Sequence, residues 1–209
     1  MTKPVQFYFS FRSTYSYLAF YRIRRLTADY PVSFEYCPVF PPQDFARKQK
    51  ENPGKLSYLR KDFIRIAKAY GLTIQLPEPF DTEWRPPHAA FLYAAEHDKG
   101  PGFALAAFNK RFLQGEDIAD KDVLKTIAAE CHLDPEELHN ASADQKRHAD
   151  LTRIGARARE VGLFGVPYFI YKDNTYWGND RLEWLLREIA LASGREVPDL
   201  QQDPLQRPF

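Results

Sequence analysis

The chain of 209 residues carries 29 basic and 28 acidic residues, so its formal net charge of +1 creates no field that recruits nucleic acid or an anionic membrane. Hydrophobic residues make up 44% of it, enough for a sizeable core in one domain, or in one domain with a large insertion. Charges interrupt every apolar stretch well short of the roughly 20 residues that span a bilayer, and the first residues lack the apolar region of a secretory signal. The sequence therefore predicts a cytoplasmic protein without nucleic-acid or membrane partners.

The first 40 residues have the pattern of a strand, a helix and a second strand. Residues 5–11 are a continuous apolar and aromatic run, typical of a strand buried on both faces. Residues 15–26 repeat apolar positions at helical spacing, and residues 32–36 alternate as a second strand does. A right-handed crossover would make the two strands parallel.

Between residues 41 and 162 the sequence predicts helices and no strand of comparable strength. The expected helices cover residues 56–67 (ended by Gly71), 88–96, 103–113, 120–131, a segment beginning at Asp134, and 143–161. Gly100 to Gly102 is interpreted as a break between two of these helices.

Strand character returns at residues 166–171, and residues 172–174 predict a turn in which Asn174 is the residue able to adopt a left-handed conformation. Residues 175–177 return as the hairpin partner. Gly178 to Asp180 then opens a final helix that runs to about Ser193.

This order of elements is the plan of an α/β protein with a thioredoxin-like fold and a large all-helical insertion. The predicted domains are a thioredoxin-like domain of residues 1–40 and 163–197, an inserted helical domain of residues 41–162, and an extended tail of residues 198–209. The two cysteines, Cys37 and Cys131, form no Cys-x-x-Cys pair and are interpreted as small buried side chains. The five histidines are not spaced as metal ligands, so no metal site is expected.

Short motifs lie where this fold builds its site. Ser13 to Ser16 occupies the place of Cys-x-x-Cys in redox members, at the N-terminus of the first helix. Residues 164–169 read Phe-Gly-Val-Pro-Tyr-Phe, residues 177–182 read Trp-Gly-Asn-Asp-Arg-Leu, and Lys55, Tyr58, Asp62 and Arg65 recur at helical spacing between them.

These motifs resemble those of the 2-hydroxychromene-2-carboxylate isomerase and kappa-class glutathione transferase family, a DsbA-like branch of the thioredoxin superfamily. The resemblance extends from Phe7 to about Leu191, with Thr14 in place of the usual proline and Arg12 in place of an apolar residue. It implies glutathione as the cofactor, a small aromatic or electrophilic substrate, and a homodimer.

Ser13 is the candidate catalytic residue. Serine is a preferred helix N-cap, which is the simplest explanation for its presence. A helix N-terminus also favours anions, and the hydroxyl can donate a hydrogen bond to the thiolate of glutathione without itself being a nucleophile.

The candidate glutathione-binding residues are Lys55, Val166, Pro167, Asn179 and Asp180. With a cis Val166–Pro167 bond, the backbone of Val166 could pair with the extended tripeptide as an added strand. The turn around Asp180 suits the γ-glutamyl end, and Lys55 suits the other carboxylate. In the alternative interpretation, Asn179 and Asp180 only cap the last helix, and Lys55 is solvated.

The substrate-binding candidates are Tyr58, Trp84, Arg85 and His88, each of which could equally pack in the core. The predicted function is a glutathione-dependent isomerase, whose thiolate adds reversibly to an aromatic or conjugated substrate. The alternatives are a kappa-class-like transferase that conjugates electrophiles and a non-catalytic protein that binds a peptide or partner. A DsbA-like thiol oxidoreductase is disfavoured because residues 13 and 16 are not cysteines.

Overall fold

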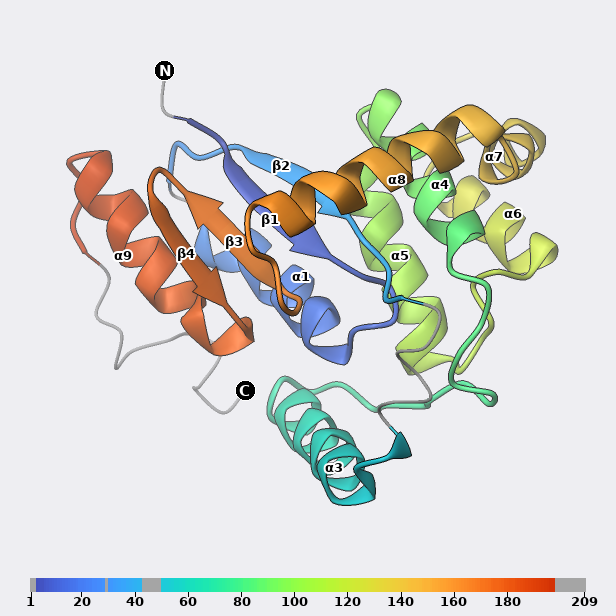
Figure 1. Ribbon diagram of the computed structural model, residues 1–209, viewed down its shortest axis with the longest axis horizontal. Coiled ribbons are helices and arrows are strands. Elements are labelled where there is room, and N and C mark those ends of the chain that lie inside the picture. The colour runs from blue at the N-terminus through green and yellow to red at the C-terminus, as the bar shows by residue number, and fades with distance from the viewer. Residues whose placement is uncertain (1–2, 29, 43–49, 198–209) are drawn as a thin grey trace.

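The N-terminal and C-terminal parts of the chain build one mixed sheet with strand order β2-β1-β3-β4 (Figure 1). The computed structural model describes residues 3–28, 30–42 and 50–197. The strands are β1 (Val5–Phe9), β2 (Phe34–Pro38), β3 (Tyr168–Tyr171) and β4 (Asn174–Trp177). β1 runs parallel to β2 and antiparallel to β3, and β3 forms a hairpin with β4. This is the predicted thioredoxin-like fold.

Helices cover both faces of the sheet, which is why Val5, Phe7, Tyr8 and Phe9 of β1 are all buried. Phe7 and Phe9 pack on Phe20 of α1 (Thr14–Leu26), with ring centroids 4.8 and 4.9 Å apart. Tyr8 points to the opposite face and packs with Cys37 and with Ala158 of α8 (Gln145–Glu160). Figure 1 shows α8 in front of the sheet and α1 behind it.

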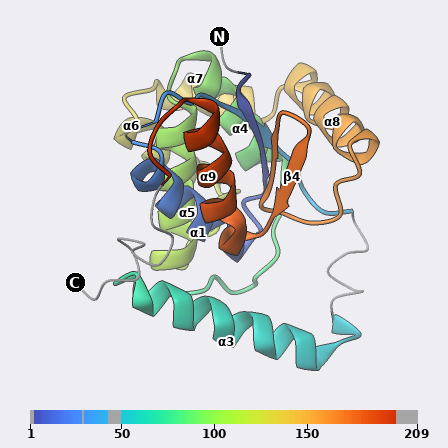
Figure 2. The ribbon, with the colours of Figure 1, turned by 90° about the vertical axis from the view of Figure 1, so that its left-hand side faces the viewer.

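The segment between β2 and β3 is helical, as predicted: no strand occurs between residues 50 and 167, all of which the structure describes. Its helices are α3 (Pro53–Ala69), α4 (Arg85–Glu96), α5 (Gly100–Leu113), α6 (Lys121–Glu130), α7 (Pro135–Ser142) and α8 (Gln145–Glu160). α4 to α7 gather at one end of the sheet, whereas α3 lies apart from them along one side of the molecule (Figure 2). None of the described helices is long and apolar enough to cross a membrane.

The inserted helices and the sheet share one hydrophobic core. Phe9 of β1 packs on Phe91 of α4, and Phe11, just after β1, packs on Phe108 of α5, at centroid distances of 4.9 and 5.0 Å. The domain boundaries at residues 40 and 163 stay a prediction, and the tail of residues 198–209 lies outside the described residues.

Three local predictions are wrong. Gly100 to Gly102 is the first turn of α5 rather than a break, because proline is tolerated in the first turn of a helix; the chain turns earlier, at Asp98, with φ of 59°. The left-handed hairpin residue is Lys172, with φ of 53°, because Asn174 already pairs with Tyr171 in the ladder. The last helix, α9 (Leu182–Ala192), follows a short 3-10 turn, η1 (Asn179–Arg181), instead of beginning there.

Candidate active site

Ser13 connects the start of α1 to the turn that precedes β3. Its backbone is extended, with φ of −85° and ψ of 115°, and its Oγ accepts a hydrogen bond from the N–H of Ser16 at 3.1 Å, which makes it the N-cap. The same hydroxyl donates to the carbonyl oxygen of Val166 at 3.2 Å. The first turn of α1 contains no acidic residue, so an anion at this helix end meets no carboxylate from that turn.

The Val166–Pro167 peptide bond is cis, as predicted. The carbonyl oxygen of Pro167 accepts a hydrogen bond from the N–H of Gly178 at 2.9 Å, which joins the turn before β3 to the residue after β4. A Cβ on Gly165 would lie 2.7 Å from the indole nitrogen of Trp177. Glycine at 165 therefore leaves room for the tryptophan that opens the second C-terminal motif.

Asn179 and Asp180 do not cap α9, because neither η1 nor α9 has a side-chain cap hydrogen bond. Asn179 is buried, and its carbonyl oxygen accepts a hydrogen bond from Nη1 of Arg22 at 2.8 Å. The side chain of Asp180 is 73% exposed and pairs with the exposed Arg181 at 2.7 Å. The capping interpretation therefore fails: Asn179 anchors the turn, whereas the carboxylate of Asp180 lies at the surface.

α3 contributes a second wall to this region. The hydroxyl of Tyr15, in the first turn of α1, donates to Oδ2 of Asp62 at 2.6 Å. Burial and the bond to Asp62 raise the pKa of Tyr15 well above its usual value, and the nearby Tyr58 and Asp180 raise it further. α1, α3 and η1 therefore meet around the Ser13 turn.

Lys55 and Tyr58 lie on the N-terminal half of α3. The backbone N–H of Lys55 is fixed by the side chain of Asn52, at 3.0 Å, whereas the lysine side chain is exposed. Tyr58 is 59% exposed. Both residues are therefore exposed to solvent, and Tyr58 lies close enough to Tyr15 to raise the pKa of its hydroxyl.

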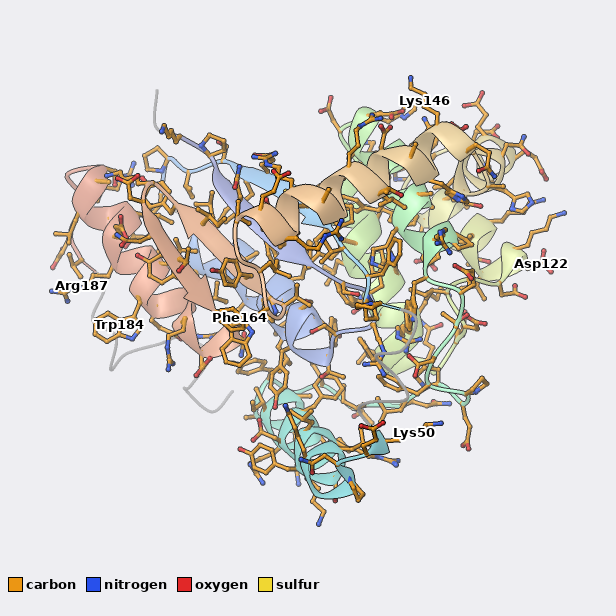
Figure 3. The ribbon with its side chains drawn as sticks, in the orientation of Figure 1. Lys50, Asp122, Lys146, Phe164, Trp184 and Arg187 are labelled. Carbon is orange, nitrogen blue, oxygen red and sulfur yellow. The ribbon has the colours of Figure 1, made fainter. Side chains whose placement is uncertain are left out.

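Two exposed aromatic residues border the Val166 turn on its outer side. Phe164 and Trp177 are 70% and 53% exposed, and their ring centroids are 5.0 Å apart. In Figure 3 Phe164 lies on the side of the sheet that is nearer to α3. Neither residue was among the sequence candidates, although each belongs to one of the two C-terminal motifs.

The four candidate substrate-binding residues do not share one surface. Tyr58 and Arg85 are exposed, and Arg85 contacts Glu83 and the ring of Phe40. Trp84 and His88 are buried. The structure therefore favours the core-packing interpretation for these last two.

His88 fixes the end of β1 against α4. Its Nε2 accepts a hydrogen bond from the backbone N–H of Phe11 at 3.3 Å, and its Nδ1 lies 2.6 Å from the carbonyl oxygen of Trp84, which requires the neutral ring with the proton on Nδ1. Burial lowers the pKa of His88 to about 4, so the ring stays neutral at neutral pH.

Arg12, which directly precedes Ser13, is held by Asp81. Its Nε lies 2.6 Å from Oδ1 and its Nη2 lies 3.2 Å from Oδ2, a two-point contact. Neither Asp81 nor Asp62 was among the sequence candidates. Asp62 could have been found, because it lies one helical turn from Tyr58 in the motif on α3; Asp81 lies in a segment without periodic pattern.

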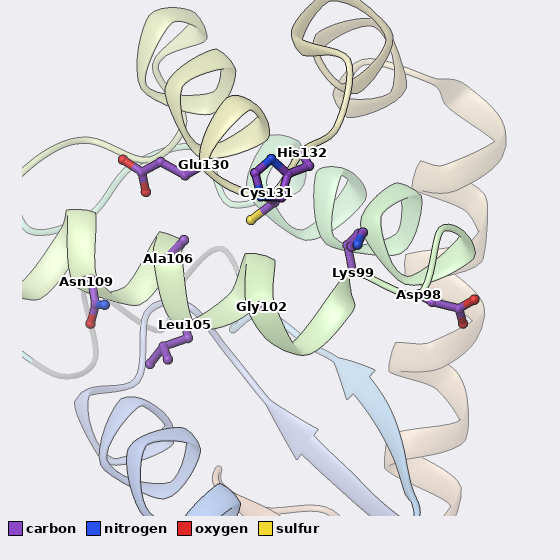
Figure 4. A pocket seen from close by; sticks show the side chains of 9 residues that line it. All are labelled: Asp98, Lys99, Gly102, Leu105, Ala106, Asn109, Glu130, Cys131 and His132. Carbon is purple, nitrogen blue, oxygen red and sulfur yellow. The ribbon is translucent and has the colours of Figure 1, made fainter.

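The cysteines lie away from the Ser13 turn. Both are free thiols; Cys37 is buried, which raises its pKa to about 12, and burial also raises the pKa of Cys131. A hollow of about 440 Å³ lies between α5 and the end of α6 (Figure 4). Cys131 lines it, but no candidate site residue does.

Comparisons with known proteins agree with this fold. The family profile of the DSBA-like thioredoxin domain matches residues 4–190. The chain is 29% identical over 192 residues to 2-hydroxychromene-2-carboxylate isomerase of Sphingobium xenophagum, which covers 88% of this chain and 97% of the relative. It is 30% identical over 193 residues to the protein of the same name from Pseudomonas putida, which covers 85% and 90%.

Among solved structures, selenomethionine 2-hydroxychromene-2-carboxylate isomerase aligns with a TM-score of 0.77 at 24% identity, covering 91% of this chain and 95% of that one. The chain belongs to the DsbA-like thioredoxin family, in the branch that contains the 2-hydroxychromene-2-carboxylate isomerases.

Proposed function

We propose that this protein is a glutathione-dependent isomerase whose substrate is a small aromatic or conjugated carboxylate, similar to the 2-hydroxychromene-2-carboxylate in the names of its relatives. The observation that carries the proposal is the Ser13 hydroxyl, which lies at the N-terminus of α1 and bonds to the carbonyl oxygen of Val166 at 3.2 Å. Supporting it are the relatives named as isomerases, at 29% and 30% identity over most of the chain.

The candidate binding residues fit glutathione by their chemistry. The exposed carboxylate of Asp180 suits the γ-glutamyl ammonium, because its present partner Arg181 is exposed and such surface pairs contribute little. The exposed Lys55 suits a carboxylate, and the backbone of the half-buried Val166 suits an extended peptide. When bound, glutathione supplies a thiolate that adds reversibly to a conjugated substrate.

Ser13 would stabilise that thiolate by turning its hydroxyl. The hydroxyl now donates to a neutral carbonyl oxygen, and a hydrogen bond to an anion is stronger than one to a neutral group. A free thiol with a pKa near 8.5 is mostly protonated at neutral pH, and lowering that pKa by about 2 units requires roughly 2.7 kcal/mol. One charge-assisted hydrogen bond together with the helix dipole supplies a contribution of this size.

The proposal is tested by following the isomerisation of 2-hydroxychromene-2-carboxylate with desalted protein. We expect a rate that saturates with reduced glutathione, recovery of the glutathione unchanged, and competitive inhibition by S-methylglutathione, whose sulfur cannot ionise. A conjugate that accumulates would instead identify a transferase. An isomerisation rate that is independent of glutathione, or no rate above buffer, would contradict the proposal.

A further inference from the structure

α5 places one arginine in the core without a carboxylate partner. Arg111 is 0% exposed, and among the described residues its only hydrogen bond runs from Nη2 to the carbonyl oxygen of Phe80. Its Nε and Nη1 are buried and have no partner among the described residues. The other strongly buried arginines, Arg12 and Arg22, pair with Asp81 and Glu183.

Aromatic rings surround the guanidinium but cannot use its hydrogen-bond donors. The central carbon of the group lies 4.7 Å from the ring centroid of Trp84, 4.8 Å from that of Phe80 and 5.2 Å from that of Phe112. Such contacts stabilise the charge through the ring faces, whereas the N–H groups point outward in the plane of the guanidinium. Nε and Nη1 therefore remain as donors for an acceptor that residues 3–28, 30–42 and 50–197 do not provide.

This group lies next to the Ser13 turn. The ring of Phe80 that contacts Arg111 also contacts Arg12, at 5.3 Å, and Arg12 is bonded directly to Ser13. Burial, and then the charge of Arg12, lower the pKa of Arg111 to about 10, whereas the carboxylates of Asp117 and Asp81 act in the opposite direction without bonding to it; the group is still a cation at neutral pH. The ring of Phe80 thus separates the guanidinium of Arg111 from that of Arg12, the residue before Ser13.

We propose that Arg111 is the specificity-determining residue that binds the carboxylate of the small-molecule substrate, an assignment that rests on the proposed function above. A carboxylate neutralises the charge and accepts from the open donors in the guanidinium plane. Because Arg111 is covered in this structure, a ligand reaches it only when residues 80–84, which include Phe80 and Trp84, shift.

The test measures binding of a simple aromatic anion rather than turnover. Benzoate and its uncharged analogue benzamide are titrated calorimetrically, without glutathione, into the wild-type protein, Arg111→Met and Arg111→Lys. We expect benzoate to bind the wild type at least about tenfold more tightly than benzamide, and Arg111→Met to remove this difference. Arg111→Lys keeps the charge but loses the planar donors, so its affinity for benzoate should be intermediate.

The matched control is Arg147→Met. Arg147 also lies over an aromatic ring, that of Tyr93 at 5.5 Å, but it pairs with Asp144 at 2.8 Å and with Glu96. It belongs to α8, which lies on the opposite face of the sheet from α1 (Figure 1). Its replacement should leave benzoate binding unchanged. The unfolding temperature of Arg111→Met should equal or exceed that of the wild type, because a buried guanidinium with two unpaired donors is costly to keep in the core.

Two results would overturn the assignment: equal binding of benzoate and benzamide by the wild type, or equal binding of benzoate by the wild type and both Arg111 variants. Neither result depends on glutathione. An isomerisation rate that is independent of glutathione would therefore not contradict anion binding by Arg111. Equal binding of benzoate and benzamide would likewise not contradict glutathione dependence.

Discussion

The hydroxyl of Ser13 has one proton to donate, and in the structure it is directed at the carbonyl oxygen of Val166. Its oxygen meanwhile accepts from the N–H of Ser16 as a helix cap. These two roles are compatible with a third, the donation of a hydrogen bond to a bound thiolate. The hydroxyl proton has only to turn from the carbonyl oxygen to the thiolate, while the oxygen continues to cap the helix. A serine that is a good cap is thereby already positioned as a donor, and capping and activation are not competing explanations of this residue.

At the same scale, His88 gives the stability a defined pH dependence. Its pKa is about 4 in the folded chain and about 6.5 when unfolded, so the unfolded state binds more protons between these values. The stabilisation from the neutral ring is complete above the unfolded pKa and is lost as pH falls toward 4. We expect this group to remove about 2 kcal/mol of unfolding free energy between about pH 7 and pH 5.

Urea unfolding of the wild type and His88→Gln at both pH values checks this. The variant should be less stable at the higher pH, because the imidazole that bonds to the backbone of Phe11 and Trp84 is gone. Its unfolding free energy should nevertheless fall by about 2 kcal/mol less on acidification than that of the wild type. Equal losses in the two proteins would show that His88 does not control this part of the acid response.

At the scale of elements, α3 is attached to the rest of the molecule by few groups. Within it, only Phe63 and Ala67 are fully buried, and Tyr15 reaches it from α1 through Asp62. Figure 2 shows α3 lying along one side of the other elements. A helix held in this way opens at a lower free energy than the sheet, and a single hydrogen bond contributes noticeably to its docking.

Tyr15→Phe should therefore loosen α3 selectively. The variant loses one hydrogen bond to a carboxylate, worth about 1 kcal/mol at a half-buried site where Asp62 keeps its contact with Arg65. Hydrogen exchange should accelerate in residues 56–69 and stay unchanged in β1 and β3.

Tyr93→Phe is the control, because Tyr93 makes a similar bond to Glu137 between α4 and α7, at 2.7 Å. It should accelerate exchange in those helices and leave α3 unchanged. If α3 in the Tyr15→Phe variant exchanged at the wild-type rate, the hydrogen bond to Asp62 would not contribute to docking, and the packing of Phe63 and Ala67 would hold the helix.

The elements themselves could be predicted from local pattern, since each strand or helix repeats its apolar residues with its own period. Asp120, Asp134 and Asp144 cap α6, α7 and α8 because a carboxylate before a helical run satisfies the first N–H groups. Ser13 and Val166 could be placed together because the fold brings the start of α1 to the turn before β3. The contacts of Tyr15 with Asp62 and the burial of Arg111 could not, because they depend on how separate helices pack.

At the scale of the whole molecule, the shared core means that the inserted helices and the sheet stabilise each other. The apolar side chains left outside that core include Trp184 and Leu191 on α9, which are 56% and 62% exposed. Figure 3 shows Trp184 pointing outward from α9. We propose that the chain forms a homodimer, for which exposed apolar surface of this kind is suited.

Sedimentation at micromolar concentration checks the assembly. A homodimer should sediment with about twice the mass of the 24.3 kDa chain. A single species at the mass of one chain would contradict the proposal, and the exposed residues of α9 would then need another explanation.

The central claim is that Ser13 sets the reactivity of bound glutathione, and titration of the bound thiolate by its ultraviolet absorbance tests it most directly. In the wild-type complex the thiol pKa should lie about 2 units below its free value. In Ser13→Ala it should rise by roughly one to two units while glutathione affinity changes less, because the ends of the tripeptide stay held. Ser33→Ala, an exposed serine before β2, should titrate as the wild type does. A thiol pKa that is the same in Ser13→Ala and in the wild type would contradict the account, and Ser13 would then be a helix cap alone.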